Sequence, residues 1–216
     1  MSRRTLRVAR IVITLLGMET FGRALESAPE HWEIDLARSS LTFNLRHVVV
    51  HQIRGEFERW GGTLLVNRSD PSLSRVRIWV DLTSITTGDA ERDAHVRSPE
   101  FLDVARFPRA VFRSTEVRIG DDEIVVKGKL DLHGVVREVE MRAIGGEVQI
   151  GADVYRRSAY NARGTIDRQA FGLHWNQDLD IGGVVVGDQV EILGHCELVR
   201  ADGAASRDLP RAGQHG

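Results

Sequence analysis

The stretch from Arg75 to Leu82 alternates between apolar and polar side chains without a break. The apolar set is Val76, Ile78, Val80 and Leu82, and the other set is Arg75, Arg77, Trp79 and Asp81. Successive side chains of a β-strand point to opposite faces, whereas a helix would mix these two sets on one surface. The stretch is therefore predicted to be a strand with one buried face.

Similar strand patterns recur along most of the chain. They cover residues 32–36, 41–53 and 63–66 before this stretch, and residues 111–119, 124–132, 135–150, 155–166 and 189–199 after it. Long strands with mostly short connections are typical of antiparallel sheets, and about eight strands can close around side chains or one small ligand. We therefore predict an all-β fold, an extended antiparallel barrel of about eight strands.

One helical segment, at about residues 88–103, interrupts the strands. Ala90 to Arg97 is predicted to form about two turns of helix. Ser98-Pro99 is then predicted to restart the helix, since serine is a common N-cap and proline fits the first helical position. Phe101 and Leu102 would form its buried side.

The apolar side of the strands is the main candidate for a binding site. It has two interpretations, a core filled by side chains or a tunnel for an elongated apolar ligand, and the sequence does not separate them. Gly128 and Gly194 lie within the apolar faces, either as bulges or barrel corners or as space for a ligand, and Gly61-Gly62 predicts a bend or a bulge. The candidate ligand-binding residues are Phe43, Leu45, Val76, Ile78, Val80, Phe101, Phe112, Val126, Leu130, Leu132, Val139, Met141, Phe171 and Ile192.

Charge and motifs exclude several classes of function. The net charge is −2 with acids and bases interspersed, which argues against nucleic-acid binding. The glycines form no nucleotide-binding motif, and we expect no cofactor. His47 and His51 have a zinc-like spacing, but on an extended segment, so no metal is expected. Cys196, the single cysteine, is predicted to be a core residue.

The two ends of the chain differ from its body. Residues 1–30 combine arginines with a short apolar run, so they are either a weak export signal or a disordered leader. If these residues are an export signal, the protein is expected in the periplasm; otherwise it is expected in the cytoplasm. Residues 31–200 are predicted to be one barrel domain and residues 201–216 a disordered tail. The apolar run is too short to span a membrane.

Several separated pieces together resemble the YceI-like family of lipocalin-like, polyisoprenoid-binding proteins. They are Trp32-x-Ile34-Asp35, Ser39-x-Leu41-x-Phe43, His47, Arg54-Gly55-x-Phe57, Arg92-Asp93-x-His95-x-Arg97-Ser98, Phe101-x-Asp103, Phe107-Pro108, Phe112, Ser114, Gly128-x-Leu130, Gly134 and Arg168-x-x-Phe171-Gly172. The chain departs from the family pattern at Arg38, Asp131 and Val136. The resemblance implies a barrel with an apolar lumen that holds an isoprenoid or fatty-acyl chain, and it implies no catalytic residues.

Three hypotheses follow. The first is binding, sequestration or transport of a long apolar lipid, namely a polyisoprenoid, an isoprenoid quinone precursor or a fatty-acyl chain. Arg54, Arg92, Asp93, His95 and Arg168 would then contact a head group or anchor the helix. The second is an enzyme acting on a lipid-like substrate with Asp93 and His95 as acid–base pair. The third is a ligand-free scaffold that binds a protein partner near Trp79. A homodimer is left open.

Overall fold

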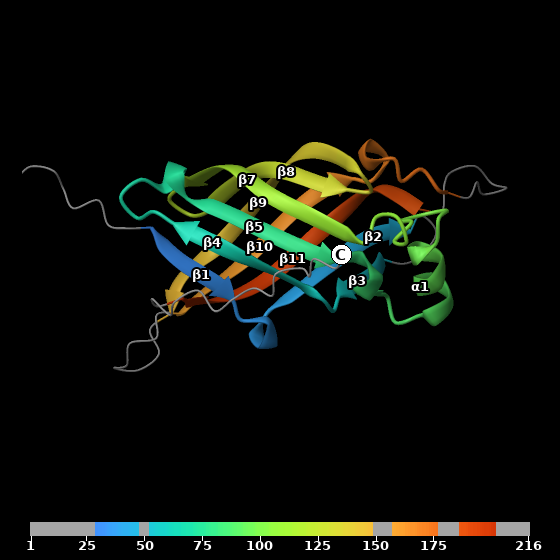
Figure 1. Cartoon of the computed structure of the whole chain (residues 1–216), viewed down its shortest axis with the longest axis horizontal. Helices are drawn as coiled ribbons and strands as arrows, with labels where there is room; N and C mark the ends of the chain where they lie inside the picture. The colour runs from blue at the N-terminus through green and yellow to red at the C-terminus, as the bar shows by residue number, and fades with distance from the viewer. Residues whose placement is uncertain (1–28, 48–51, 149–156, 177–185, 202–216) are drawn as a thin grey trace, which may run out of the picture.

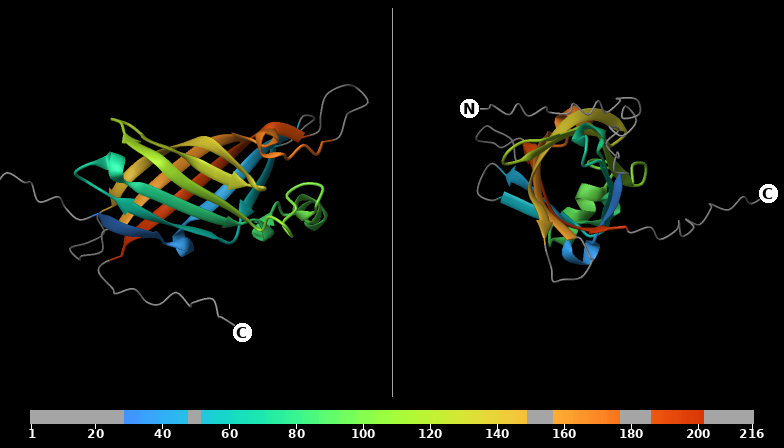
Figure 2. Two further views of the ribbon diagram at one scale, coloured as in Figure 1. Left: turned by 45° about the horizontal axis from the view of Figure 1, so that its top comes forward. Right: turned by 90° about the vertical axis from the view of Figure 1, so that its left-hand side faces the viewer.

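The chain forms an elongated, twisted barrel with a short helix at one end (Figure 1, Figure 2). The computed structural model describes residues 29–47, 52–148, 157–176 and 186–201. The strands are β1 (Glu30–Ile34), β2 (Ser40–His47), β3 (Gln52–Phe57), β4 (Trp60–Val66), β5 (Arg75–Asp81), β6 (Ile85–Thr86), β7 (Arg109–Ile119), β8 (Ile124–Leu132), β9 (Val135–Val148), β10 (Arg157–Asp167) and β11 (Val186–Arg200). The helix is α1 (Ala90–Arg97), and the 3-10 turns are η1 (Leu36–Arg38), η2 (Pro71–Leu73), η3 (Leu82–Ser84) and η4 (Gln169–Phe171).

Eight strands close the barrel in the order β1, β4, β5, β7, β8, β9, β10 and β11, because β1 pairs with both β4 and β11. Strands β2, β3 and β6 continue the wall at the end that carries α1 (Figure 1). Both β1 and β2 pair with β11, so they are two parts of one strand that η1 interrupts. The prediction of an antiparallel barrel of about eight strands is confirmed.

The alternation that defined β5 has its expected consequence. Arg75, Arg77 and Trp79 are exposed, whereas the apolar residues between them are partly buried. A two-residue turn joins β8 to β9, and both of its residues, His133 and Gly134, have a positive φ (54° and 73°). Such turns match the twist of the flanking strands and hold the register of the hairpin.

The predicted bend or bulge at Gly61-Gly62 is wrong, because both glycines lie inside β4 and its register with β5 is continuous. They are needed for space: a Cβ atom on Gly61 would lie 2.9 Å from the ring of Trp79, and one on Gly62 would lie 2.5 Å from the Ile78 side chain. The strand is instead interrupted just before the glycines, where β3 ends at Phe57 and β4 begins at Trp60. Large side chains on the neighbouring strand explain glycines that looked like turn residues.

Helix α1 spans Ala90–Arg97 as predicted, and Asp89 is its N-cap. The Asp89 carboxylate accepts hydrogen bonds from the N–H groups of Glu91 and Arg92, at 3.1 and 3.0 Å. The predicted restart at Ser98 is wrong: residues 98–102 form turns. Ser98 is extended (ψ 167°), as expected before a proline, and its carbonyl accepts from the N–H of Asp103, which has a φ of 44°.

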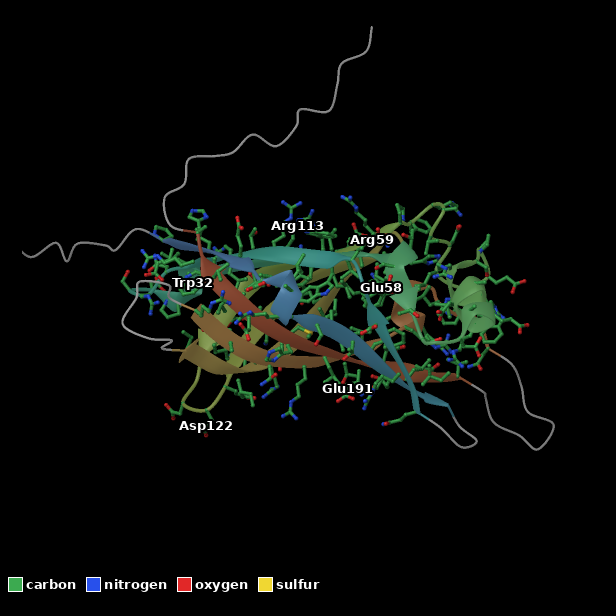
Figure 3. All side chains as sticks on the ribbon, turned by 90° about the horizontal axis from the view of Figure 1, so that it is seen from below. Trp32, Glu58, Arg59, Arg113, Asp122 and Glu191 are labelled. Atoms are coloured by element: carbon green, nitrogen blue, oxygen red, sulfur yellow. The ribbon has the colours of Figure 1, made fainter. Side chains whose placement is uncertain are left out.

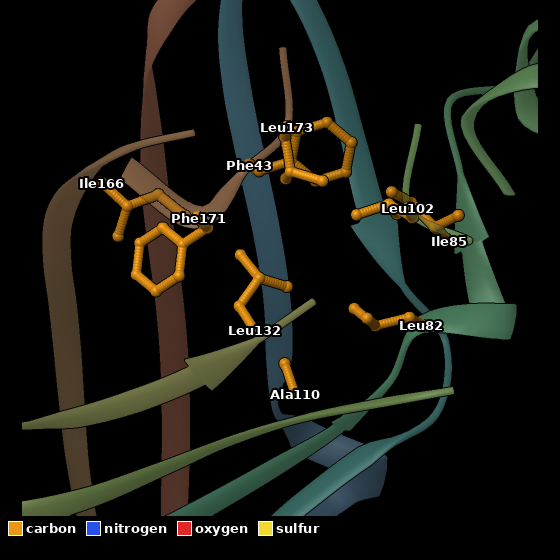
Figure 4. Packing of buried hydrophobic residues seen from close by; sticks show 9 residues of the cluster. All are labelled: Phe43, Leu82, Ile85, Leu102, Ala110, Leu132, Ile166, Phe171 and Leu173. Atoms are coloured by element: carbon orange, nitrogen blue, oxygen red, sulfur yellow. The ribbon is translucent and has the colours of Figure 1, made fainter. Parts of the chain in front are cut away.

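A hydrophobic cluster lies inside the barrel at the end that carries α1 (Figure 4). The turn segment after α1 inserts Leu102 into the cluster, and η3 and η4 contribute Leu82 and Phe171. Fully burying one such side chain stabilises the fold by about 1.5–3 kcal/mol. The irregular segments at this end are therefore part of the core and hold the surrounding side chains in place.

Candidate functional site

An apolar cavity of about 340 Å³ lies at the end of the barrel that carries α1. Its volume is at the lower end of the range of about 300–1,000 Å³ that is typical of small-molecule sites. Its polar lining residues are Thr87, Arg92, His95 and Arg168. Its apolar lining residues are Phe43, Leu45, Ile53, Phe57, Leu82, Ile85, Val96, Phe101, Leu102, Leu132, Ile166, Leu173, Trp175, Val186, Val190 and Ile192.

The candidate ligand-binding residues fall into three groups. Phe43, Leu45, Phe101, Leu132 and Ile192 line the cavity. Phe171, Val80, Leu130 and Val139 belong to the hydrophobic cluster beside it or pack against that cluster. Val76, Ile78, Phe112, Val126 and Met141 are buried or partly buried on other parts of the strands and do not line the cavity. The structure thus brings together only part of the predicted set.

Large side chains occupy the barrel interior where these last residues lie. The Phe112 ring packs over Gly128, where an added Cβ would lie 2.6 Å from it. Met141 packs over Gly164 in the same way. The register between β7 and β8 also shifts between Ser114 and Glu116, so a bulge lies in β7 opposite Gly128 and not at the glycine itself. At Gly128 the missing side chain makes room for Phe112 and a bulge.

Periodicity missed most of the cavity. Ile85, Leu173 and Trp175 lie in a two-residue strand or in loops, where no alternation marks an inner face. Val190 lies on the predicted apolar face of its strand, and Ile53 is in a regular strand whose alternation was a usable signal. Irregular segments become part of a wall only through tertiary packing.

A buried carboxylate ties α1 to the barrel. Asp93 is 6% exposed, and its oxygens accept hydrogen bonds from the Thr86 hydroxyl (3.1 Å), the Thr87 N–H (2.8 Å) and the Thr87 hydroxyl (2.6 Å). Arg92 donates to the Thr87 hydroxyl (2.7 Å) and carbonyl (3.1 Å), and Arg97 donates to the Ile85 carbonyl (3.0 Å). These contacts fix the helix over the cavity.

Two opposing effects act on the pKa of Asp93. Burial on its own raises that pKa, because it disfavours the charged form. The hydrogen bonds from Thr87 and Thr86 and the positive charge of Arg97 outweigh burial, so the pKa lies below its ordinary value. Asp93 is therefore held as a carboxylate that anchors the helix.

His95 lies at the cavity with one unsatisfied nitrogen. Its ring meets Trp175 edge-on with 4.5 Å between centroids, and Trp175 also lies 6.0 Å from the Phe101 ring. Nε2 is 3.3 Å from a carboxylate oxygen of Glu100, but the alignment does not make a hydrogen bond. Within the described ranges, it is the buried side-chain polar atom that lacks a hydrogen-bond partner. His95 can therefore offer a hydrogen bond to a ligand.

Arg168 is 1% exposed, and every N–H of its guanidinium has an acceptor. Nε donates to the Gly187 carbonyl (3.0 Å), and Nη1 donates to the carbonyls of Leu173 (2.6 Å) and Trp175 (2.9 Å). Nη2 donates to the Val186 carbonyl (3.1 Å) and to the carboxylate of Asp188 (3.3 Å). Burial lowers the pKa of Arg168, against the opposing charges of Asp188 and Asp167. Arg168 therefore clamps the end of β10 to the start of β11 and to the segment between them.

Two other predicted arrangements are not assembled. Arg54 is exposed on β3, where its Nε lies 3.4 Å from the Asn44 side-chain oxygen, and it does not line the cavity. Asp93 does not line the cavity either, because its oxygens face Thr86 and Thr87. Asp93 and His95 therefore do not form an acid–base pair at one site.

Trp79, the residue behind the scaffold hypothesis, lies on the outer wall and is 37% exposed. Its ring packs over Gly61 on one strand, and the Arg109 guanidinium lies 5.8 Å from the ring centroid on another. Trp79 is therefore only partly exposed, beside Arg109.

The remaining predictions concern metals, cysteine and termini. In the described part of the chain, no cluster of three or more His, Cys, Asp or Glu side chains could hold a metal ion. His51 lies outside the described residues. Cys196 is partly buried, and burial raises the pKa of its thiol to about 11. None of the described helices is long and apolar enough to cross a membrane. The leader up to residue 28 and the tail from residue 202 also lie outside the described residues.

The sequence of this chain matches one protein family and curated relatives within it. The family described as "YceI-like domain" matches residues 32–198. The protein named "Protein YceI" of Salmonella newport (strain SL254) is 35% identical over 136 residues, which cover 62% of this chain and 70% of the relative. A second "Protein YceI", from Salmonella arizonae, matches to the same extent.

The fold is similar to that of solved structures. BcnA of Burkholderia cenocepacia superposes with a TM-score of 0.65 at 22% identity, covering 76% of this chain and 98% of BcnA. A polyisoprenoid binding domain from Saccharophagus degradans, implicated in plant cell wall breakdown, gives a TM-score of 0.58 at 16% identity, covering 78% of this chain and 98% of that chain. At these identities the similarity establishes the fold alone.

Proposed function

The chain belongs to the YceI-like domain family, and we propose that it binds, sequesters or transports a long apolar lipid inside the barrel. The ligand class is a polyisoprenoid, an isoprenoid quinone precursor or a fatty-acyl chain. The observation that carries the proposal is the cavity beside α1, whose lining is apolar except at Thr87, Arg92, His95 and Arg168. The polyisoprenoid binding domain from Saccharophagus degradans, which shares the fold, supports the same ligand class.

The lining favours a flexible hydrocarbon chain. Burying a CH₂ group contributes about 0.8 kcal/mol, so six or seven such groups supply roughly 5 kcal/mol without any polar contact. A long chain then extends beyond the cavity, since its volume of about 340 Å³ is small. The apolar part of the ligand lies among Phe43, Leu45 and Ile192 in this proposal.

The polar group of the ligand lies beside His95 and Arg92. Nε2 of His95 is without a hydrogen-bond partner, and Arg92 is 38% exposed at its side chain. Arg168 is a poor candidate because its donors are all engaged, and Arg54 is on the outer wall. The polar contacts fix the orientation of the chain, and apolar burial supplies most of the affinity.

Extraction with organic solvent followed by mass spectrometry tests the proposal. Purified protein is expected to release a long-chain lipid in a fixed molar ratio. The Val190→Phe variant, which places a larger side chain in the cavity wall, is expected to release much less. Ile119→Phe, at an exposed position away from the cavity, makes a similar change in size and serves as the control. Equal lipid recovery from both variants, or none from the wild-type protein, would contradict the proposal.

A further inference from the structure

The strand register collects basic side chains on the outer wall of β5, β7 and β8. Arg77 on β5 lies directly opposite Arg113 on β7, and Arg113 lies directly opposite Lys129 on β8. Arg75 and Arg109 extend the group along the same strands, and all five are exposed. Figure 3 shows Arg113 projecting outward from the barrel. Since these residues are far apart in the sequence, only strand pairing makes them neighbours.

Three acids lie beside this basic face: Asp81 is opposite Arg109, Asp131 is opposite Val111 and Glu138 is opposite Lys129. Among the described residues, Arg77, Arg113 and Lys129 form no side-chain ion pair or hydrogen bond, although Glu138 lies opposite Lys129. Elsewhere on the outer wall Arg118 pairs with Glu116 at 2.8 Å. Like charges directly opposite each other destabilise strand pairing. The row therefore weakens the barrel slightly, and an external anionic partner would offset that cost.

Apolar side chains accompany the charges. Trp79 lies two residues from Arg77 on the same outer face and is 37% exposed. Val136 on β9 is 50% exposed and pairs with Asp131, the cross-strand neighbour of Val111. Tryptophan is enriched at membrane–water interfaces because it has an apolar body and a polar N–H. Basic side chains next to an exposed tryptophan are what an anionic bilayer surface attracts.

We propose that the outer face formed by Arg75, Arg77, Trp79, Arg109, Arg113 and Lys129 docks onto the surface of an anionic lipid bilayer. A bilayer fits better than a nucleic acid, because the charges lie on the flank of the barrel and not on a helix or ribbon that could enter a groove. The net charge of −2 confines the attraction to this face. The inference rests on the outer wall and is independent of what the cavity holds.

Flotation of the full chain with lipid vesicles tests this proposal. The wild-type protein is expected to float with vesicles of phosphatidylcholine and phosphatidylglycerol, but not with phosphatidylcholine alone, and to be released as salt rises. Each basic residue near an anionic surface changes partitioning roughly fivefold, so the double variant Arg77→Gln/Arg113→Gln is expected to bind roughly 30-fold more weakly. This variant removes repulsion and is expected to fold at least as stably as the wild type.

The matched control is Arg38→Gln/Arg163→Gln, which changes the net charge equally at exposed positions in η1 and β10. It is expected to keep wild-type partitioning within about threefold, since charges away from the contact are largely screened. An equal loss in both variants, or no binding by the wild type, would overturn the proposal. In a competition experiment, duplex nucleic acid and free phosphatidylglycerol vesicles are each added to the vesicle-bound protein. If nucleic acid releases the protein at the lower concentration, the face binds nucleic acid and the proposal is overturned. Lipid recovery from the cavity does not bear on any of these outcomes.

Discussion

Replacing Gly128 with alanine is expected to destabilise the barrel strongly. Its Cβ atom would lie 2.5 Å from the backbone carbonyl oxygen of Arg113 and 2.6 Å from the Phe112 ring. A side chain can rotate away, but a carbonyl in a strand pair moves only with its strand. Overpacking typically lowers the free energy of unfolding by about 1–3 kcal/mol. Because the contact is with a backbone oxygen, we expect Gly128→Ala to lower it by about 3 kcal/mol.

Gly194 is the matched control, because it is also an interior glycine in a long strand. A Cβ there would lie 3.6 Å from Cys196 Sγ and 3.8 Å from the Ala162 Cβ, which are ordinary contacts. Gly194→Ala is expected to stabilise the protein by about 0.4–1 kcal/mol, because alanine has less backbone freedom in the unfolded chain. The same substitution thus has opposite signs at two positions that the sequence does not distinguish.

Urea unfolding of the two variants measures the difference. With a slope of about 3 kcal/mol per M, the midpoint of Gly128→Ala is expected to fall by roughly 1 M, and that of Gly194→Ala to rise by roughly 0.2 M. Equal midpoints, or a stable Gly128→Ala protein, would show that the interior at Phe112 is not packed as described.

Three further predictions concern single side chains. The pKa of Asp93 is lowered on folding, so its stabilising contribution is complete above its ordinary pKa and is lost as the pH falls through the lower folded value. Asp93→Asn should therefore lower the free energy of unfolding by about 2 kcal/mol at neutral pH and make stability depend less on pH in the acid range. An unchanged dependence on pH in the acid range would contradict this. Arg168→Lys should lower the free energy of unfolding by at least about 2 kcal/mol, because an ammonium group has three donors and the guanidinium of Arg168 serves five acceptors. Thermal or denaturant unfolding measures this, and unchanged stability would refute the structural role of Arg168. The Cys196 thiol, with its pKa raised to about 11, should react with iodoacetamide far more slowly in the folded than in the urea-unfolded protein at neutral pH, and equal rates would contradict its burial.

Regular strands were predictable because their evidence is local. Alternation in Arg75–Asp81 and a two-residue turn at His133-Gly134 each define their structure from neighbouring residues alone. The first turn of α1 was also predictable, since Asp89 caps it through its own side chain. Ser98 does take the extended backbone of an N-cap, and its hydroxyl accepts from the Glu100 N–H (3.3 Å). The predicted helix fails after one turn, because Asp103 adopts a positive φ of 44° and ends it.

The cavity was only partly predictable, because its walls depend on long-range packing. Arg168 looked like a head-group residue, but its partners Val186 and Gly187 become neighbours only when β10 pairs with β11. Phe112 was predicted to line the lumen together with Phe43. Because Gly128 has no side chain, the Phe112 ring instead packs over Gly128 in the barrel interior. Alternation predicts which side of a strand is buried, but not whether the buried space is filled.

The most direct test of the central claim is to locate a bound lipid by photo-crosslinking. The probe is a long-chain fatty acid with a diazirine at its terminal carbon, and crosslinked residues are identified by mass spectrometry. If the lipid occupies the cavity beside α1, the crosslinks fall on its lining, such as Leu45, Ile53 and Ile192, and disappear in Val190→Phe. Crosslinks confined to the outer wall, or unchanged in Val190→Phe, would contradict lipid binding in this cavity.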